Sequence, residues 1–315
     1  MTKDKGKNGN DDQNSLFGKN GLFENIGKGL DELFGTVGET WSNFFGATDS
    51  DPKSPDFLSN LEEALKQQQK KSGQPNQDPD PKATALIVTF QTGIHTKDKK
   101  YLTHAVVQYR EDVFERTENG ELLIAYTKAC TFVGNLENSL EGLKRQPSSE
   151  KVREARGLVA YAAGNHFAAA GNFKLAEKQL GSKSRIAYSL ALHKCGGVNT
   201  NKLKEILSPL LDKSGVANAI IGCAYSKEGD SKNAEEYLEK AAELNPTSEK
   251  TRLDLMRTKV LNGNHGEVNA NMNQFYVDTG SQLSVDEIES ELDNRVVEMP
   301  NLNIKNVYTT IDKLI

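Results

Sequence analysis

The sequence predicts an all-α protein in which pairs of helices stack into a solenoid. After residue 82, apolar side chains recur at helical rather than strand spacing, and short polar breaks separate successive helical stretches. The 315 residues are enough to bury a core, but only 36% of them are hydrophobic. This low share predicts a folded part joined to disordered segments. We expect the solenoid over residues 83–280 and a helical cap or tail over 281–315.

Residues 1–20 are expected to form a disordered tail. They consist mainly of Lys, Asp, Asn, Gln and Gly, and the apolar pair Leu16 and Phe17 stands alone among them. So few apolar side chains cannot offset the conformational entropy lost on ordering.

An eleven-residue repeat follows in the amphipathic segment 21–46, which reads LFENIGKGLDE, then LFGTVGETWSN, then FFG. This period corresponds to about 3.67 residues per turn, so on a helix the apolar side chains form one continuous stripe. The predicted attachment stripe consists of Leu22, Phe23, Ile26, Leu30, Leu33, Phe34, Val37, Trp41, Phe44 and Phe45.

The same segment is a weak helix former, because each of its interior glycines costs about 1 kcal/mol relative to Ala. We expect it to become helical when the stripe is covered by a membrane interface, a partner's groove or the chain's own solenoid. The segment resembles the eleven-residue amphipathic repeats of lipid-surface proteins over about two and a half repeats. Residues 22–45 carry one Lys and four acidic residues, so membrane contact would depend on apolar insertion rather than on charge.

Residues 47–82 are predicted to hold a short helix and a Pro/Gln-rich linker. Phe57, Leu58, Leu61 and Leu65 recur at helical spacing, and the polar, proline-containing run SGQPNQDPDPK follows. Beyond the linker, Ala85–Gln91 is apolar and rich in β-branched residues, as in a buried strand, but no comparable second strand follows it. A buried first helix fits better.

Two further helices are expected before residue 150. Apolar positions from Leu102 to Val113 mark one helix that ends near Asn119, and those from Leu122 to Leu140 mark another that ends before Pro147. From Glu150 the helical pattern continues with few breaks.

Residues 215–248 resemble a tetratricopeptide repeat. Small, aromatic and helix-ending side chains fall at this family's spacing within 34 residues, among them Gly222, Tyr225, Ala234, Ala241 and Pro246. The resemblance implies that Gly222 and the alanines let two helices approach closely, that Tyr225 fills the space beside Gly222, and that Pro246 closes the unit.

Partial copies of this repeat are expected on both sides of it. One starts near Gly157 and places Gly164, Phe167 and Ala176 at the repeat-packing offsets, and another starts at Glu249. The interval from Gly157 to Gly215 is 58 residues, ten short of two full repeats, so we expect the helix pair between them to be shortened.

Stacks of such repeats resemble scaffolds that hold a peptide or a helix in a concave groove. One subset of the family binds acidic C-termini through Lys and Asn near the start of the first helix. The corresponding positions here are Val216, Ala219, Ile220 and Cys223, which are apolar. This departure favours a hydrophobic partner or self-assembly.

The sequence offers little support for catalysis, metal binding or nucleic-acid binding. A net charge of -5 argues against a nucleic-acid partner. The five histidines are scattered, and no zinc spacing, phosphate-binding loop or GxSxG motif is present. Cys130, Cys195 and Cys223 stand far apart and are expected to be reduced thiols. We expect no catalytic residues, no metal and no cofactor.

The sequence therefore predicts a non-enzymatic, cytoplasmic scaffold or adaptor whose groove binds a protein or peptide and whose stripe provides a second attachment. The alternative is a membrane-peripheral organiser that residues 22–45 recruit and that assembles with itself through its repeats.

Overall fold

The computed structural model describes residues 57–72, 80–196, 198–264, 266–268, 270, 299–300 and 307–315. These residues form helices and turns without any strand, which confirms the predicted all-α class. The chain divides into two compact units, Met1–Gln146 and Pro147–Ile315. The predicted tail and attachment stripe lie outside the described residues.

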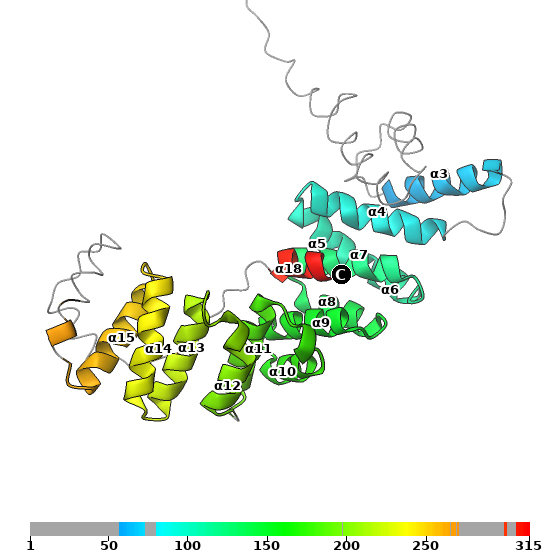
Figure 1. The fold of residues 1–315 in the computed structure, drawn as a ribbon. Helices are drawn as coiled ribbons and strands as arrows, with labels where there is room; N and C mark the ends of the chain where they lie inside the picture. Colours follow the sequence, from blue (N-terminus) through cyan, green and yellow to red (C-terminus); the bar gives the residue numbers. More distant parts are fainter. Residues whose placement is uncertain are drawn as a thin grey trace, which may run out of the picture. The chain divides into compact units, whose positions relative to one another are not determined.

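The helices of the first unit are α3 (Phe57–Ser72), α4 (Pro81–His95), α5 (Lys99–Gln108), α6 (Arg110–Phe114), α7 (Gly120–Val133) and α8 (Leu136–Arg145). Those of the second unit are α9 (Glu150–Ala162), α10 (His166–Leu175), η1 (Glu177–Gln179), α11 (Ser182–Lys194), α12 (Thr200–Leu207), η2 (Ser208–Leu210), α13 (Gly215–Lys227), α14 (Ser231–Leu244), α15 (Glu249–Leu261) and α18 (Val307–Leu314). Figure 1 shows them along the chain.

One recurring turn joins the two helices of a pair. Gly134 ends α7 with a φ of 85°, in the left-handed region that glycine adopts without strain, and Asn135 N–H donates to the Cys130 carbonyl at 2.8 Å. Asn135 then caps α8, because its side chain accepts from the backbone N–H of Asn138. The turn therefore both ends one helix and starts the next.

The same left-handed glycine recurs at nearly constant spacing. Gly134, Gly164, Gly196, Gly229 and Gly263 all have positive φ and are 30, 32, 33 and 34 residues apart. Each of these glycines follows the first helix of a pair. Their spacing shows that a unit of about one tetratricopeptide length repeats from α7 to α15. Lys97, with a φ of 56°, takes this place between α4 and α5.

The second helix of each pair buries the residues four and eight positions after its cap. These residues are Leu102 and Val106 in α5, Ser139 and Leu143 in α8, Ala169 and Phe173 in α10, Leu203 and Leu207 in α12, and Ala234 and Leu238 in α14. Because they share one helical face, each second helix packs on its first helix along a narrow stripe.

The core of the first unit forms around Tyr126. Its ring meets Phe90 and Phe114 edge-on at 5.5 Å, and its hydroxyl donates to the Val106 carbonyl at 3.1 Å. Phe90 belongs to α4, so the helix predicted over Ala85–Gln91 is confirmed.

In the second unit, first helices pack on first helices. α9 contacts α10 and α11, α11 contacts α12 and α13, and α13 contacts α14 and α15. Figure 1 shows α11 to α15 side by side. We call α9, α11, α13 and α15 the first-helix row.

Three expectations about helix boundaries were wrong. Leu102–Val113 is not one helix that ends near Asn119, since Tyr109 divides it into α5 and α6 and α6 ends at Phe114. Leu122–Leu140 is not one helix, since Gly134 divides it into α7 and α8. The pair α11 and α12 is also not shortened, because the left-handed glycines on either side of it keep nearly the full repeat spacing. The apparent deficit arose from aligning Gly157 with Gly215, whereas Gly157 corresponds to Gly222.

Candidate functional site

Close contact between the helices of a pair depends on glycines that lack a Cβ atom. A Cβ on Gly222 would lie 2.7 Å from Leu238 Cγ and 3.1 Å from the Ala234 carbonyl oxygen. A Cβ on Gly157 would lie 2.6 Å from the ring of Phe173. Gly222 in α13 and Gly157 in α9 therefore serve the same role, each against the second helix of its own pair.

Two residues that we expected to pack inside the first copy have other roles. Phe167 is 84% exposed, on the outer side of α10, and Gly164 is the left-handed glycine of the turn, with open space around its missing Cβ. The expectation failed because it placed the copy seven residues too late. Ala176, from the same set, is buried.

The other repeat-packing residues lie in or beside α13 and α14. Ala234 and Ala241 are buried, and Pro246 is exposed just beyond the end of α14. Tyr225 stacks on Tyr237 with ring centroids 5.7 Å apart, and Lys204 Nζ lies 5.3 Å from the Tyr237 centroid. Tyr225 thus joins α13 to α14 at a partly exposed site rather than in the core.

Two faces of α13 can be distinguished by their residues. Gly215 and Gly222, seven residues apart, face α14. Val216, Ala219, Ile220 and Cys223 are spaced as a second helical face, which we call the α13 stripe. Val216 is half-buried and the other three residues are buried.

A buried carboxylate lies next to this stripe. Cys223 Sγ donates to Asp254 Oδ2 of α15 across 3.9 Å, and Asp254 is buried, as is Arg252. Sequence reasoning missed these buried charges, because their positions follow no motif and Cys223 meets Asp254 only when α13 packs on α15.

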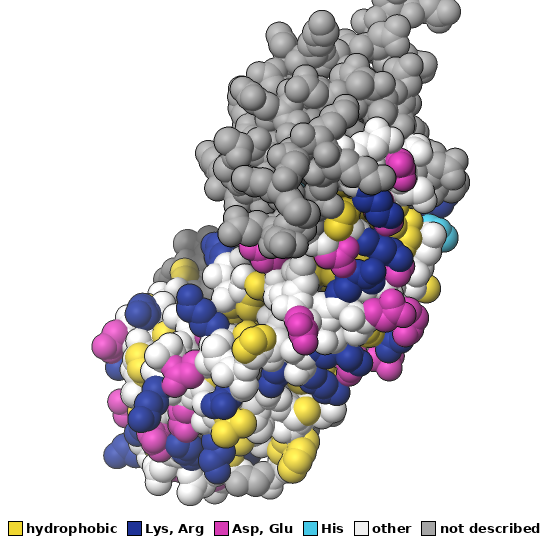
Figure 2. Space-filling model, turned by 90° about the vertical axis from the view of Figure 1, so that its right-hand side faces the viewer, with side chains coloured by type: hydrophobic (Ala, Val, Ile, Leu, Met, Phe, Trp, Pro, Cys, Tyr) yellow, Lys and Arg dark blue, Asp and Glu magenta, His cyan; other side chains and the backbone are white. Residues whose placement is uncertain are grey.

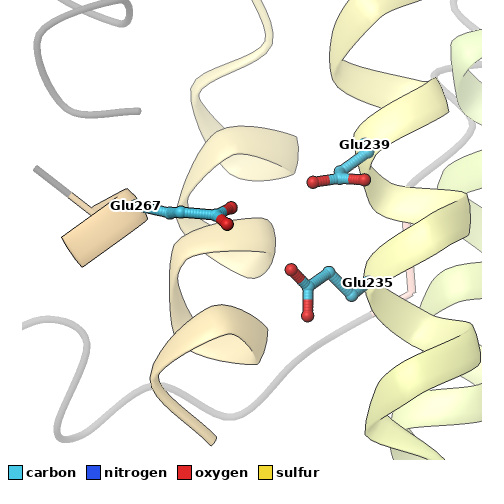
Figure 3. Close-up of side chains that lie close together, drawn as sticks. All are labelled: Glu235, Glu239 and Glu267. Atoms are coloured by element: carbon cyan, nitrogen blue, oxygen red, sulfur yellow. The ribbon is translucent and has the colours of Figure 1, made fainter. Parts of the chain in front are cut away.

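A cluster of three carboxylates is the one metal-like arrangement found among the described residues. Glu235 and Glu239 of α14 and Glu267, just after α15, point toward one another (Figure 3). The chain itself supplies the cation, since Lys259 Nζ lies 2.8, 2.5 and 2.5 Å from their oxygens. The cluster is therefore an ion-pair network that joins α14 to α15.

The electrostatics of the cluster follow from this geometry. Burial opposes ionisation of both Lys259 and Glu235, but their mutual hydrogen bonds outweigh it. The pKa of Lys259 is therefore raised, and the pKa of Glu235 is lowered from its ordinary value of 4.5. Asn262 and Asn264 also donate to Glu235.

The visible surface carries mixed charge. In Figure 2, basic and acidic side chains alternate over the described part of this face, and apolar side chains form small separate groups. Among the described helices, none is long and apolar enough to cross a membrane.

Comparison with known families agrees with the repeat derived from the turns. Residues 217–248 match the tetratricopeptide repeat family, and this range runs from α13 to the residue that caps α15. A search of curated proteins by sequence found no match. Residues 217–248 are thus similar to one tetratricopeptide repeat, and the neighbouring helix pairs are built on the same turn.

Proposed function

We propose that this tetratricopeptide-like protein is a non-enzymatic scaffold that binds a protein or peptide along the first-helix row. The observation that carries the proposal is the family match at residues 217–248, within a row of helix pairs that share one turn and one packing pattern. Tetratricopeptide repeats are generally protein-interaction modules, and adjacent first helices give a continuous surface for an extended ligand.

The chemistry of the α13 stripe favours an apolar ligand. Its residues offer no ammonium or amide group to a carboxylate, and Val216 is the member that remains accessible at the start of the helix. Because Ala219, Ile220 and Cys223 are already buried, an apolar side chain on the ligand would bury further surface at Val216, with a gain of about 25 cal/mol for each Å². Partners of this kind include a segment of another protein and a second copy of this chain.

Residues 22–45 form the second element of the proposed scaffold. Their apolar stripe and low intrinsic helicity suit a segment that folds on contact, either with a partner groove or with a neutral membrane surface. The membrane-peripheral organiser is the alternative function that this segment supports.

Capture from native lysate with the tagged full chain tests the role of the first-helix row. Val216→Asp places a charge on the α13 stripe and should reduce recovery of the specific partner at least tenfold, because an unpaired carboxylate cannot be buried against an apolar ligand. Phe167→Asp is the matched control, since it puts the same charge on the outer side of α10 and should leave recovery unchanged. Loss of the partner with Phe167→Asp alone would place binding on the second helices and contradict the proposal.

A third arm of the experiment concerns residues 22–45. The double substitution Phe34→Asp and Trp41→Asp should abolish co-sedimentation of the full chain with neutral liposomes while leaving capture through the first-helix row intact. If neither the wild type nor the variant sediments, the segment serves no membrane and the organiser hypothesis is rejected.

A further inference from the structure

The C-terminal helix α18 packs on the helix that opens the second unit. Its principal contact is with α9, whereas a cap would cover α15 at the other end of the row. Ile311 is fully buried, Tyr308 is partly buried, and Thr309, Asp312 and Lys313 are exposed. The aromatic and aliphatic residues are three positions apart, so α18 lies on α9 through one amphipathic face.

A second point of contact lies at the other end of the row. Met299 packs against a cluster that consists of Cys223 of the α13 stripe, Leu238 and Ala242 of α14, and Leu255 of α15. Two separate parts of the C-terminal residues therefore pack on the repeats, one where α13, α14 and α15 meet and the other at α9.

The chain is long enough to make both contacts. Only α11 lies between α13 and α9 in the row, and packed helix axes are about 8–10 Å apart, so the separation is about 20 Å. Met299 and Ile311 are twelve residues apart in sequence, and an extended chain of that length reaches about 40 Å.

Burial of the first helices agrees with an occupied surface. Eight consecutive residues of α13, 217–224, are buried, which is more than two complete turns and so every direction around the helix. In α14, by contrast, the buried residues are Ala234, Leu238, Ala241 and Ala242, which lie on one side. α13 is therefore covered all round, by α11, α12, α14 and α15 and by the cluster that Met299 joins.

We propose that the first-helix row is a binding site for an amphipathic helix with an aromatic residue three positions before an aliphatic one, and that α18 is its resident ligand. An incoming partner helix of the same pattern displaces α18 from α9. This inference rests on the proposed function and adds to it the class of partner and the means by which binding is restrained. A ligand tethered in the same chain competes at an effective concentration in the millimolar range, so displacement requires a tight or multivalent partner.

The test uses a fluorescein-labelled synthetic peptide of residues 299–315 and the full chain. In the wild type the resident helix competes with the peptide, whereas Ile311→Asp should release α18 and tighten peptide binding at least tenfold, as measured by fluorescence anisotropy. Thr309→Asp adds the same charge on the exposed side of α18 and should bind the peptide no better than wild type. A labelled peptide that itself carries Ile311→Asp should not bind.

Hydrogen exchange distinguishes the release of α18 from a general folding defect in the variant. In the Ile311→Asp chain, amides of α9 should exchange faster while those of α14 stay unchanged, and saturating wild-type peptide should restore protection of α9. Equal peptide affinity for the Ile311→Asp and Thr309→Asp chains, or unchanged exchange in α9, would overturn the inference. If partner capture is still lost in Val216→Asp, the proposed function survives that failure.

Discussion

Replacing Lys259 with Met is expected to lower the free energy of unfolding by about 3 kcal/mol. Lys259 is only 2% exposed, and its ammonium group neutralises three carboxylates that would otherwise repel one another. The expected loss of stability lies at the lower end of the range for broken buried ion pairs. The reason is that Glu239 and Glu267 are 47% and 61% exposed and remain hydrated. Urea denaturation followed by circular dichroism measures the change.

Two variants make this prediction specific. Lys240→Met removes an exposed Lys of α14. It should change the free energy of unfolding by less than about 0.5 kcal/mol, as is usual for surface sites. Adding Glu235→Gln to Lys259→Met should recover part of the loss, since it removes the least exposed of the uncompensated carboxylates. If Lys259→Met were as mild as Lys240→Met, the cluster would not join α14 to α15 in solution.

The effect of Lys259→Met should also depend on pH. The pKa of Glu235 is lower in the folded chain than its ordinary value of 4.5, so this carboxylate stabilises the fold above that pH and loses its contribution as the pH falls. The difference between wild type and Lys259→Met should therefore persist at neutral pH and shrink below about pH 4.5. A difference that grows in acid would contradict the assigned ion pair.

Gly222→Leu is expected to destabilise the second unit by about 2 to 3 kcal/mol through overpacking. The new Cβ would lie 2.7 Å from Leu238 Cγ and 3.1 Å from the Ala234 carbonyl oxygen, a backbone atom that cannot move away by changing rotamer. Gly157→Leu should behave alike, because its Cβ would meet the buried ring of Phe173 at 2.6 Å.

Gly171→Leu is the matched control for these variants. Gly171 also lies within a helix, but nothing is within 4 Å of its missing Cβ, so the larger side chain meets no neighbour. Since glycine inside a helix costs about 1 kcal/mol relative to Ala, Gly171→Leu should melt at the wild-type temperature or above it. Equal melting temperatures for all three variants would show that the helix pairs do not pack in this register.

The all-α class and the best repeat could be predicted from the sequence because they depend on local signals. Periodic apolar residues place the helices, and Asp or Asn residues such as Asp98 and Asn165 cap them through short-range hydrogen bonds. The repeat at residues 215–248 was recognisable because Gly222, Tyr225 and Ala234 all fall at the family's spacing.

The register of the other repeats could not be predicted so readily. Gly157 and Gly164 are seven residues apart, as are Gly222 and Gly229, so either glycine of the first copy could be aligned with Gly222. Only the sign of φ separates them, because Gly164 is left-handed and forms the turn. The regular series of left-handed glycines, from Gly134 to Gly263, would have fixed the register.

The Lys259 cluster and the docking of α18 escaped prediction for a different reason. Glu235 and Lys259 belong to different helices and meet only when these pack, and no short motif marks either residue. Likewise, the sequence of α18 indicates an amphipathic helix but not the distant helix, α9, that it covers. Such contacts depend on tertiary packing rather than on local pattern.

The central claim is that the first helices form the buried row of a repeat array. Amide hydrogen exchange of the whole chain tests this claim most directly. Residues 217–224 of α13 are all buried, whereas α14 alternates buried and exposed residues, so α13 should exchange more slowly than α14, and α9 and α11 more slowly than α10 and α12. Faster exchange in the first helices than in their partners, across all of these pairs, would contradict the assignment of the row as the covered binding surface.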